Sequence, residues 1–172
     1  MTARVLIGTA TAAVALLVGG AIKAALPWPP ATEGEPMQAR VVAVVDGDTL
    51  RVEDLDGHDL GRVRLLGIDA PEVAHPPAPA DCYADAATDR LQQLAPIGSI
   101  VDLATDSAQD NRDRYGRILR YVDHAGLDVS RELLAAGAAR LYEHSRHIAR
   151  GTSYITAART AQDSSLGLWG NC

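Results

Sequence analysis

The chain has 172 residues, of which 47% are hydrophobic and 22% are charged, and its formal net charge is −6. This composition is typical of a globular protein, and it excludes a fully disordered chain, a collagen-like fibre and a membrane protein with several spans. The length predicts one domain with a single core, and because phenylalanine is absent, aliphatic side chains must fill most of that core.

The first 26 residues predict a targeting segment rather than a part of the fold. Residues 5–22 carry no charge and are rich in alanine, glycine, valine and leucine. A run of this length lies between the apolar region of a signal peptide and a short membrane span. Within residues 1–26 we therefore expect either an uncleaved signal anchor, with residues 5–22 in the membrane, or a cleaved signal peptide. Both alternatives place the remaining chain outside the cytoplasm, as an anchored or a secreted protein.

Prolines dominate the following segment, residues 27–36. Proline restricts the backbone and cannot donate a hydrogen bond, so this segment is expected to be an extended linker. Because this proline-rich segment follows the apolar run directly, it also argues against residues 5–22 being a buried core helix. The domain is therefore expected to comprise residues 37–172.

Alternating and β-branched patterns predict three strands at the start of the domain. Residues 41–45 form a continuous β-branched run of the fully buried type, and residues 49–53 alternate between apolar and polar side chains. Residues 61–68 form the returning strand after a turn at 54–59. That turn superficially resembles an EF-hand loop, but its ligand spacing is wrong and no glutamate closes a loop of the required length.

Helices and two further strands follow. Apolar residues at helical spacing predict a helix over about 83–95, which ends before Pro96. Strands are expected over about 99–105 and 116–122. Ser130 is a plausible N-cap of a short helix that stops at Gly137, and a last helix is expected over about 145–165. Five strands with about three helices predict an α+β domain, a five-stranded OB-fold β-barrel preceded by an N-terminal hydrophobic segment.

Charge is distributed unevenly along the domain. Residues 41–110 contain 14 acidic and 4 basic side chains, a net charge of −10, whereas residues 111–159 contain 9 arginines and 5 acidic side chains, a net charge of +4. This asymmetry has two explanations: a solvated surface, or an acidic pocket for a cation beside an arginine face for an anion.

Three short motifs contain the residues best suited to catalysis: Asp-Gly-Asp-Thr at 46–49, Arg-Leu-Leu-Gly-Ile-Asp-Ala-Pro-Glu at 64–72 and Asp-Arg-Tyr-Gly-Arg at 113–117. Each alone has an ordinary explanation as a turn, an exit loop or a surface hairpin. In this order and at these separations, they closely resemble the staphylococcal nuclease (thermonuclease) family. The resemblance covers about residues 37–169.

The resemblance implies a calcium site. Asp48 and Asp69 correspond to the two carboxylate ligands of the family, and the backbone carbonyl of Ala70 corresponds to its third protein ligand. Asp46 corresponds to a carboxylate that supports these ligands from behind. Hard oxygen donors are the ligands that calcium prefers, and carboxylates gathered in this way would repel one another without a cation.

The same resemblance implies a catalytic set. Glu72 corresponds to the general base that activates water, and Arg64 and Arg117 correspond to the two arginines that hold the phosphate. Arg114 and Tyr115 correspond to substrate-binding positions. The base-stacking tyrosines of the family are not matched, because Tyr142 is out of register by about one residue.

These residue types suit phosphodiester hydrolysis on chemical grounds. A phosphodiester repels an attacking hydroxide, and its oxygens gain negative charge in the transition state. A hard cation and two guanidinium forks offset that charge, and a carboxylate can accept the proton of the attacking water. On this interpretation the acidic half and the arginine half of the domain together form one pocket.

The predicted function is calcium-dependent hydrolysis of DNA and RNA with little sequence specificity. The resemblance further implies attack of water at phosphorus and 3′-phosphate products. An inactive nuclease-like barrel, which binds nucleic acid or a protein at the cell surface, is the main alternative, and a purely structural exported domain is a third. We expect a monomer without an obligate protein partner.

The two cysteines, Cys82 and Cys172, exclude a multi-bridge scaffold and a four-cysteine zinc site. Lone cysteines are often buried thiols, but the predicted export places this pair in an oxidising compartment. We therefore expect a disulfide between them that fixes the C-terminus to the body of the domain.

Overall fold

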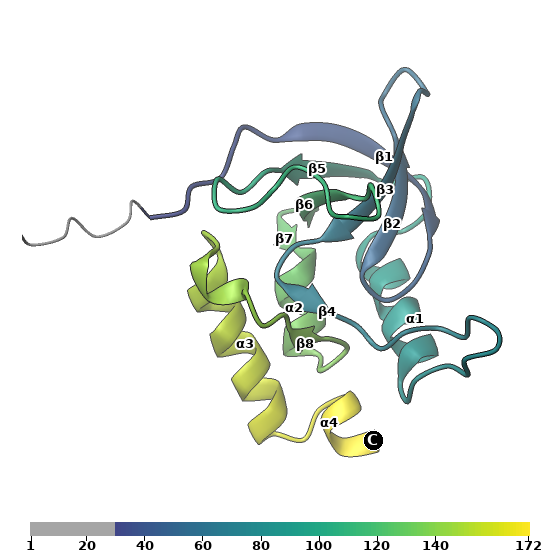
Figure 1. Ribbon diagram of the computed structural model, residues 1–172, viewed down its shortest axis with the longest axis vertical. Coiled ribbons are helices and arrows are strands. Elements are labelled where there is room, and N and C mark those ends of the chain that lie inside the picture. Colours follow the sequence, from purple (N-terminus) through teal and green to yellow (C-terminus); the bar gives the residue numbers. More distant parts are fainter. Residues whose placement is uncertain (1–29) are drawn as a thin grey trace, which may run out of the picture.

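The structure is a computed structural model that describes residues 30–172 (Figure 1). The expected signal peptide or anchor, and the first three residues of the expected linker, lie outside the described residues. Within residues 30–172, no helix is long and apolar enough to cross a membrane.

Five strands form a closed barrel, with the helices gathered at one end of it (Figure 1). They are β1 (Met37–Val44), β2 (Thr49–Glu53), β3 (Asp59–Leu65), β5 (Ile100–Ala104) and β6 (Ile118–His124). Neighbours follow the order β3-β2-β1-β5-β6, and β3 pairs with β6 in parallel to close the barrel. The other barrel pairs are antiparallel. The predicted five-stranded α+β barrel is thus confirmed.

Strand β1 begins four residues before its predicted start and bends between two partners. Residues 37–40 pair with β5, and residues 40–44 pair with β2. The register between β1 and β2 shifts between Val41 and Ala43. Such a bulge bends a strand and increases its twist, which a small closed barrel requires.

The core is aliphatic, as the absence of phenylalanine predicts. Side chains from every barrel strand are nearly inaccessible to solvent; they include Val41, Leu50, Val52, Val63, Leu65, Val101, Leu103 and Val122. Two tyrosines are the largest buried side chains, Tyr121 and Tyr154, and their rings meet edge to face with centroids 6.2 Å apart. Each hydroxyl donates to a carboxylate, because a buried hydroxyl without a partner would be costly.

Three helices cover this end of the barrel: α1 (Ala84–Leu94), α2 (Val129–Ala135) and α3 (Gly151–Asp163). Helix α2 packs between α1 and α3. The prediction of α1 is correct to within one residue at each end. For α2 the predicted N-cap is wrong, since the Asp128 side chain accepts the Arg131 N–H, while Ser130 lies buried within the first turn.

The last helix also starts later than predicted. Residues 145–147 form a separate 3₁₀ turn, η1 (Ser145–His147), and α3 begins only at Gly151. Between them the Ala149 N–H donates to the Asp106 carboxylate at 2.7 Å instead of to a helical carbonyl. The Ser145 hydroxyl is similarly tied to the Gly67 carbonyl. These tertiary hydrogen bonds interrupt what the sequence pattern presents as one helix.

Short elements complete the fold. The predicted strand 61–68 is divided by a turn at 66–67, so that β4 (Ile68–Asp69) forms a second small sheet with β8 (Arg140–Leu141). Strand β7 (Leu127–Asp128) pairs antiparallel with the end of β6, and α4 (Leu168–Asn171) lies at the C-terminal end of the chain. A Cβ at Gly137 would lie 2.2 Å from the Leu166 carbonyl oxygen, so a glycine is required where α4 approaches the body of the domain.

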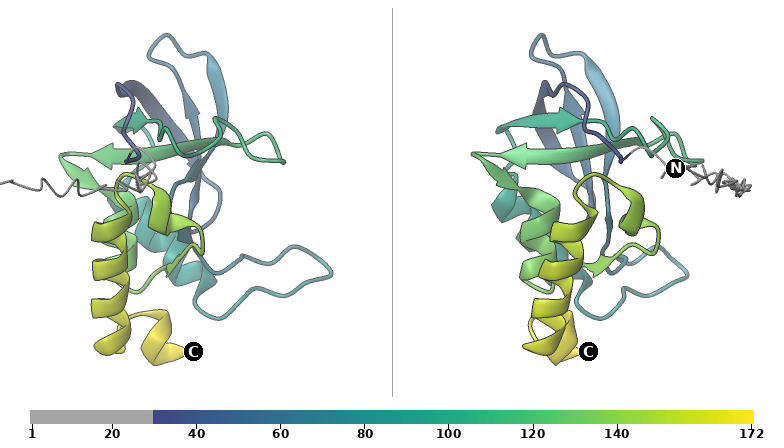
Figure 2. Two further views of the ribbon diagram at one scale, coloured as in Figure 1. Left: turned by 60° about the vertical axis from the view of Figure 1, so that its left-hand side comes forward. Right: turned by 90° about the vertical axis from the view of Figure 1, so that its left-hand side faces the viewer.

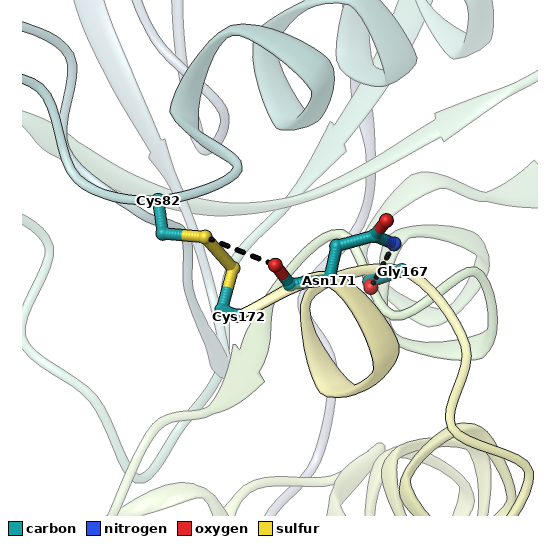
Figure 3. The surroundings of a disulfide bond; sticks show 4 residues. All are labelled: Cys82, Gly167, Asn171 and Cys172. Carbon is teal, nitrogen blue, oxygen red and sulfur yellow. Dashed lines mark hydrogen bonds between the residues drawn. A yellow bond between two sulfur atoms is a disulfide. The ribbon is translucent and has the colours of Figure 1, made fainter.

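Cys82 and Cys172 form the expected disulfide (Figure 3). Cys82 precedes α1 and Cys172 follows α4, so the bridge joins the two segments across a sequence separation of 90 residues. Trp169 of α4 also stacks on Arg140 of β8, with the guanidinium 4.6 Å from the ring centroid. The C-terminus is therefore held both by a covalent bond and by packing.

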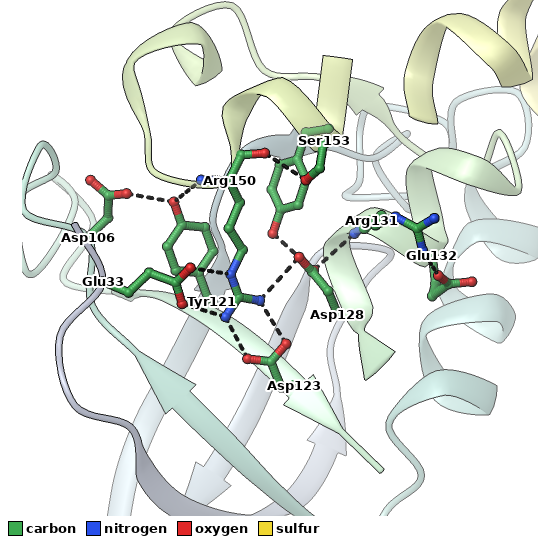
Figure 4. Close-up of polar contacts among 10 residues, drawn as sticks. Glu33, Asp106, Tyr121, Asp123, Asp128, Arg131, Glu132, Arg150 and Ser153 are labelled. Carbon is green, nitrogen blue, oxygen red and sulfur yellow. Dashed lines mark hydrogen bonds and ion pairs between the residues drawn. The ribbon is translucent and has the colours of Figure 1, made fainter. Parts of the chain in front are cut away.

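A network around Arg150 fixes the start of the described chain (Figure 4). Its guanidinium binds Asp123 at 2.7 Å, Asp128 at 3.1 Å and Glu33 at 2.6 Å. Neighbouring backbone groups pair residues 32–34 with residues 105–107. The C-terminal part of the expected linker is thus packed on the domain.

Candidate active site

Six of the predicted site residues line one pocket of about 450 Å³; they are Arg64, Asp69, Glu72, Arg114, Tyr115 and Arg117. The first three come from β3, β4 and the segment after β4. The others come from the turn before β6. Because β3 and β6 are paired in parallel, the residues that follow β3 lie close to the turn before β6, although they are far apart in the sequence.

Arg64 is held on the wall of the pocket by four contacts. Its Nε lies 3.0 Å from Asp48 Oδ1, and its Nη2 donates to Asp69 Oδ1 at 2.8 Å. Its Nη1 donates to the carbonyls of Leu65 and Ile68 at 3.1 and 2.7 Å. The guanidinium is largely buried, so its orientation is fixed before any ligand binds.

The corner after β1 places Asp48 behind the pocket. Asp46 Oδ1 accepts the Asp48 N–H at 3.0 Å, which fixes the turn as the sequence motif implies. A Cβ at Gly47 would lie 2.7 Å from the side chain of Ala70 and 2.9 Å from that of Ala87, so only glycine fits there. Asp48 Oδ2 in turn accepts the Ala70 N–H at 2.8 Å. The predicted metal-binding residues are thereby brought together.

Burial governs the ionisation of Asp48. Asp48 is only 4% exposed, and this burial raises the pKa of its carboxyl to about 7; nearby Asp46 adds to the rise, while Arg64 and the Ala70 N–H oppose it. A cation beside Asp48 would favour the charged form and lower this pKa.

The donor set fits a hard divalent cation. It consists of the carboxylates of Asp48 and Asp69, which contact the same guanidinium, and the carbonyl of Ala70. Among the hydrogen bonds of residues 30–172, none is accepted by the Ala70 carbonyl oxygen. All three donors are oxygens, as calcium and magnesium require.

A second acidic group lies elsewhere. Asp54, Asp56 and His58 bring their ligand atoms within 4.8 Å of one another in the exposed turn between β2 and β3. Hydrogen bonds inside the turn account for this proximity, because Asp54 accepts the backbone N–H groups of Asp56 and His58. It is the turn that the sequence predicts, and it contains none of the predicted ligands.

Asp113 organises the turn that presents Arg117. Its Oδ1 accepts the N–H groups of Tyr115 and Arg117 at 2.9 and 3.0 Å, and its Oδ2 accepts Arg117 Nε at 2.7 Å. Burial alone would raise the pKa of Asp113, but these hydrogen bonds outweigh burial and lower it. Among the described residues, no hydrogen bond engages the terminal nitrogens of Arg117, so the guanidinium fork remains available for an anion.

Arg114 and Tyr115 lie at the rim. The Arg114 guanidinium lies 4.7 Å from the Tyr115 ring centroid, and the Arg117 guanidinium lies 5.5 Å from it. Tyr115 is 61% exposed. A cationic, aromatic rim of this kind suits an anionic substrate that carries flat rings.

Glu72 is an exposed residue of the pocket lining. Within residues 30–172, no hydrogen bond or ion pair reaches its carboxylate. Its backbone, in contrast, is bonded at both polar groups to Asp81. A free carboxylate on a fixed backbone is suited to accept a proton from a bound water.

Sequence reasoning missed two residues of the pocket wall, Gln109 and His144, and set Tyr142 aside as out of register. Tyr142, His144 and Gln109 also line it, and the rings of Tyr142 and His144 meet edge to face at 5.4 Å. The Tyr142 N–H donates to the Gly67 carbonyl, which brings the segment after β8 to the pocket. No local sequence pattern predicts the hydrogen bond between Tyr142 and Gly67, because it depends on the pairing of β4 with β8.

The arginine half of the chain serves two purposes. Arg114 and Arg117 line the pocket, but Arg150 is engaged in the internal ion network, and Arg120 donates to backbone carbonyls. The interpretation of one anion-binding arginine face is therefore too broad. Only part of the positive charge faces the pocket.

Comparison with known proteins identifies the family of the chain. Residues 62–171 match the family model described as staphylococcal nuclease homologue. A thermonuclease of Staphylococcus intermedius is 33% identical over 129 residues, 75% of this chain and 74% of the relative. An uncharacterized endonuclease of Escherichia coli is 38% identical over 108 residues, 62% of each chain. An SPbeta prophage-derived endonuclease of Bacillus subtilis is 33% identical over 126 residues, 73% of this chain but only 41% of the relative. The matched part thus spans less than two thirds of the last two relatives.

Proposed function

The chain belongs to the staphylococcal nuclease family, and we propose on this basis that it hydrolyses phosphodiester bonds in nucleic acids. The observation that carries the proposal is the convergence of Arg64, Glu72 and Arg117 on one pocket, beside the buried carboxylate of Asp48 and the exposed carboxylate of Asp69. In finer detail, we infer calcium dependence, action on both DNA and RNA with little sequence specificity, and 3′-phosphate ends.

Phosphate binding is assigned to the two arginines. The terminal nitrogens of Arg117 offer a bidentate fork to two phosphoryl oxygens, while Asp113 prevents the side chain from turning away. Arg64 contributes a second, buried positive charge. Fixed donors of this kind typically contribute about 3 kcal/mol each to transition-state stabilisation.

Glu72 is assigned the proton transfer. Its exposed carboxylate can accept a proton from water and aim the oxygen at phosphorus, a contribution of roughly 10²- to 10⁴-fold. Asp48, Asp69 and the Ala70 carbonyl would hold the calcium ion. When bound, that ion supplies the positive charge that balances the carboxylates and the developing charge on the phosphate.

Export is part of the proposal. The disulfide supports it, because such bonds persist mainly in oxidising compartments. We infer a protein that acts outside the cytoplasm, either secreted or anchored through residues 5–22. Mass spectrometry of the native N-terminus distinguishes the two, since a cleaved signal peptide removes the first residues.

A digestion assay tests the function. Purified protein is incubated with plasmid DNA, and separately with RNA, in the presence of calcium or of a calcium chelator. We expect degradation of both substrates with calcium, none with chelator, and 3′-phosphate ends on the products. A protein that binds the plasmid but leaves it intact in calcium would instead support the inactive, binding barrel.

A further inference from the structure

The segment that carries Glu72 leaves the body of the domain. Between β4 and α1 the chain forms an irregular loop that projects away from the barrel (Figure 2). Glu72 lies at the start of this loop, and Asp81 lies at its end. The Glu72 carboxylate has no partner among the described residues, so its position depends on its own backbone.

Asp81 closes the loop at its base through two hydrogen bonds. The Glu72 N–H donates to Asp81 Oδ2 at 3.1 Å, and the Asp81 N–H donates to the Glu72 carbonyl at 2.9 Å. The second bond involves backbone atoms only, whereas the first requires the Asp81 side chain. Together they engage both backbone polar groups of Glu72, which restricts the direction in which its side chain leaves the chain.

Asp81 is itself fixed to the body of the domain. Cys82 follows it directly and is bonded to Cys172 (Figure 3). The Asp81 carbonyl accepts the Ala84 N–H at the start of α1. The N–H of Leu168 in α4 donates to the Gly137 carbonyl at 2.9 Å, so α4 is attached in turn. Asp81 thus connects an exposed loop to a rigid support.

From this geometry we propose that Asp81 is a positioning residue for Glu72. Its carboxylate acts by accepting the Glu72 N–H and does not touch substrate. The inference rests on the proposed function of Glu72 as the general base. A displacement of a catalytic group by about 1 Å can reduce turnover by about 10²-fold, so loss of this hydrogen bond is expected to lower kcat.

Two substitutions separate positioning from charge. Asp81→Ala removes the acceptor, and we expect kcat to fall about 10-fold or more with KM changed less than about twofold. Asp81→Asn keeps an oxygen that can accept the same N–H, and we expect its kcat to stay within about threefold of the parent. The melting temperature of both variants should stay close to that of the parent, because Asp81 is exposed and lies outside the core.

Asp54→Ala is the matched control. Asp54 also accepts backbone N–H groups in an exposed turn, but that turn lies between β2 and β3, away from the pocket residues. This variant should retain the parent kcat. If circular dichroism shows that Asp81→Ala is unfolded, Asp81→Ser replaces it with the same expectation. The serine hydroxyl is one bond closer to the backbone than the aspartate carboxylate oxygen, so it does not reach the Glu72 N–H.

Steady-state kinetics on one DNA substrate, with Glu72→Gln in the same series, decides the matter. An inactive Glu72→Gln variant together with a parent-like Asp81→Ala variant would overturn the positioning role. Equal losses in Asp81→Asn and Asp81→Ala would also overturn it, because the charge would then matter rather than the acceptor. Failure of the proposed function is distinguishable, since the parent itself would digest nothing.

Discussion

Removal of the disulfide is the perturbation with the best defined magnitude. Replacing Cys82 and Cys172 by serine opens a loop whose ends are 90 residues apart. The chain-entropy model gives about 4.5 kcal/mol for a closed loop of this size, as an upper figure. A domain of about 140 residues has an unfolding entropy of about 0.3 kcal/mol/K, so the melting temperature should fall by as much as about 15 °C.

Thermal unfolding followed by circular dichroism measures this change. The parent protein treated with reductant is the control, and its melting temperature should fall to that of the double serine variant. Activity at 25 °C should persist, because the Asp81 carbonyl still accepts the Ala84 N–H of α1, and the hydrogen bonds between Glu72 and Asp81 do not involve the sulfur atoms. An unchanged melting temperature in the variant, or two free thiols in the denatured, unreduced parent, would refute the reasoning.

Other predictions concern the pocket. Glu72→Gln should lower kcat by about 10²-fold or more while calcium binding is kept, and Glu35→Gln, at an exposed position outside the pocket, should leave kcat unchanged. Arg117→Lys should cost nearly as much activity, because lysine lacks the guanidinium fork. Arg62→Lys, on the outer face of β3, should leave activity unchanged, and equal rates in the two variants would contradict the role of Arg117 in phosphate binding. Calcium should bind the free protein weakly, with Kd on the order of 10⁻⁴ to 10⁻³ M, because three protein ligands leave most of the shell of about six to eight oxygens to water and substrate; sub-micromolar affinity in titration calorimetry would reject this. Burial raises the pKa of Asp48 to about 7 from an ordinary value of 3.8, so without calcium this group stabilises the fold below about pH 4 and loses that contribution as pH rises toward 7. The melting temperature of the parent should therefore fall relative to that of Asp48→Asn over this range, and a constant difference between the two would argue against the raised pKa.

The elements that were predicted correctly are those whose apolar pattern is complete within a few consecutive residues. The alternation of residues 49–53 and the apolar face of α1 are set by nearest neighbours in the sequence, and both elements lie where expected. The two-residue strands β4 and β8 are too short to show a period, and they exist because Ile68 pairs with Leu141 across the fold. The start of α3 was misplaced for the same reason, since Asp106 takes the Ala149 N–H from far away in the sequence.

The candidate site divides in a similar way. Residues within the three motifs could be named from the sequence, because the types of residue and their spacing point to one chemistry. The structure brings them to one pocket, with Asp46, Asp48 and Ala70 behind it. The supporting contacts could not be named, because Asp81 and Tyr142 act through hydrogen bonds to Glu72 and Gly67 that have no sequence signature.

The packing of residues 32–34 determines where a mechanical load would enter the domain. Any attachment upstream of Thr32, whether a bilayer or a surface to which the protein is coupled, pulls first on the hydrogen bonds to Ser107 and on the ion pair between Glu33 and Arg150. The force would reach the barrel strands only after these contacts break. Gln109, two residues beyond Ser107, already lines the pocket. A tethered molecule would therefore be held close to the rim of its own pocket, so the tether itself would restrict the directions from which a long polymer can approach.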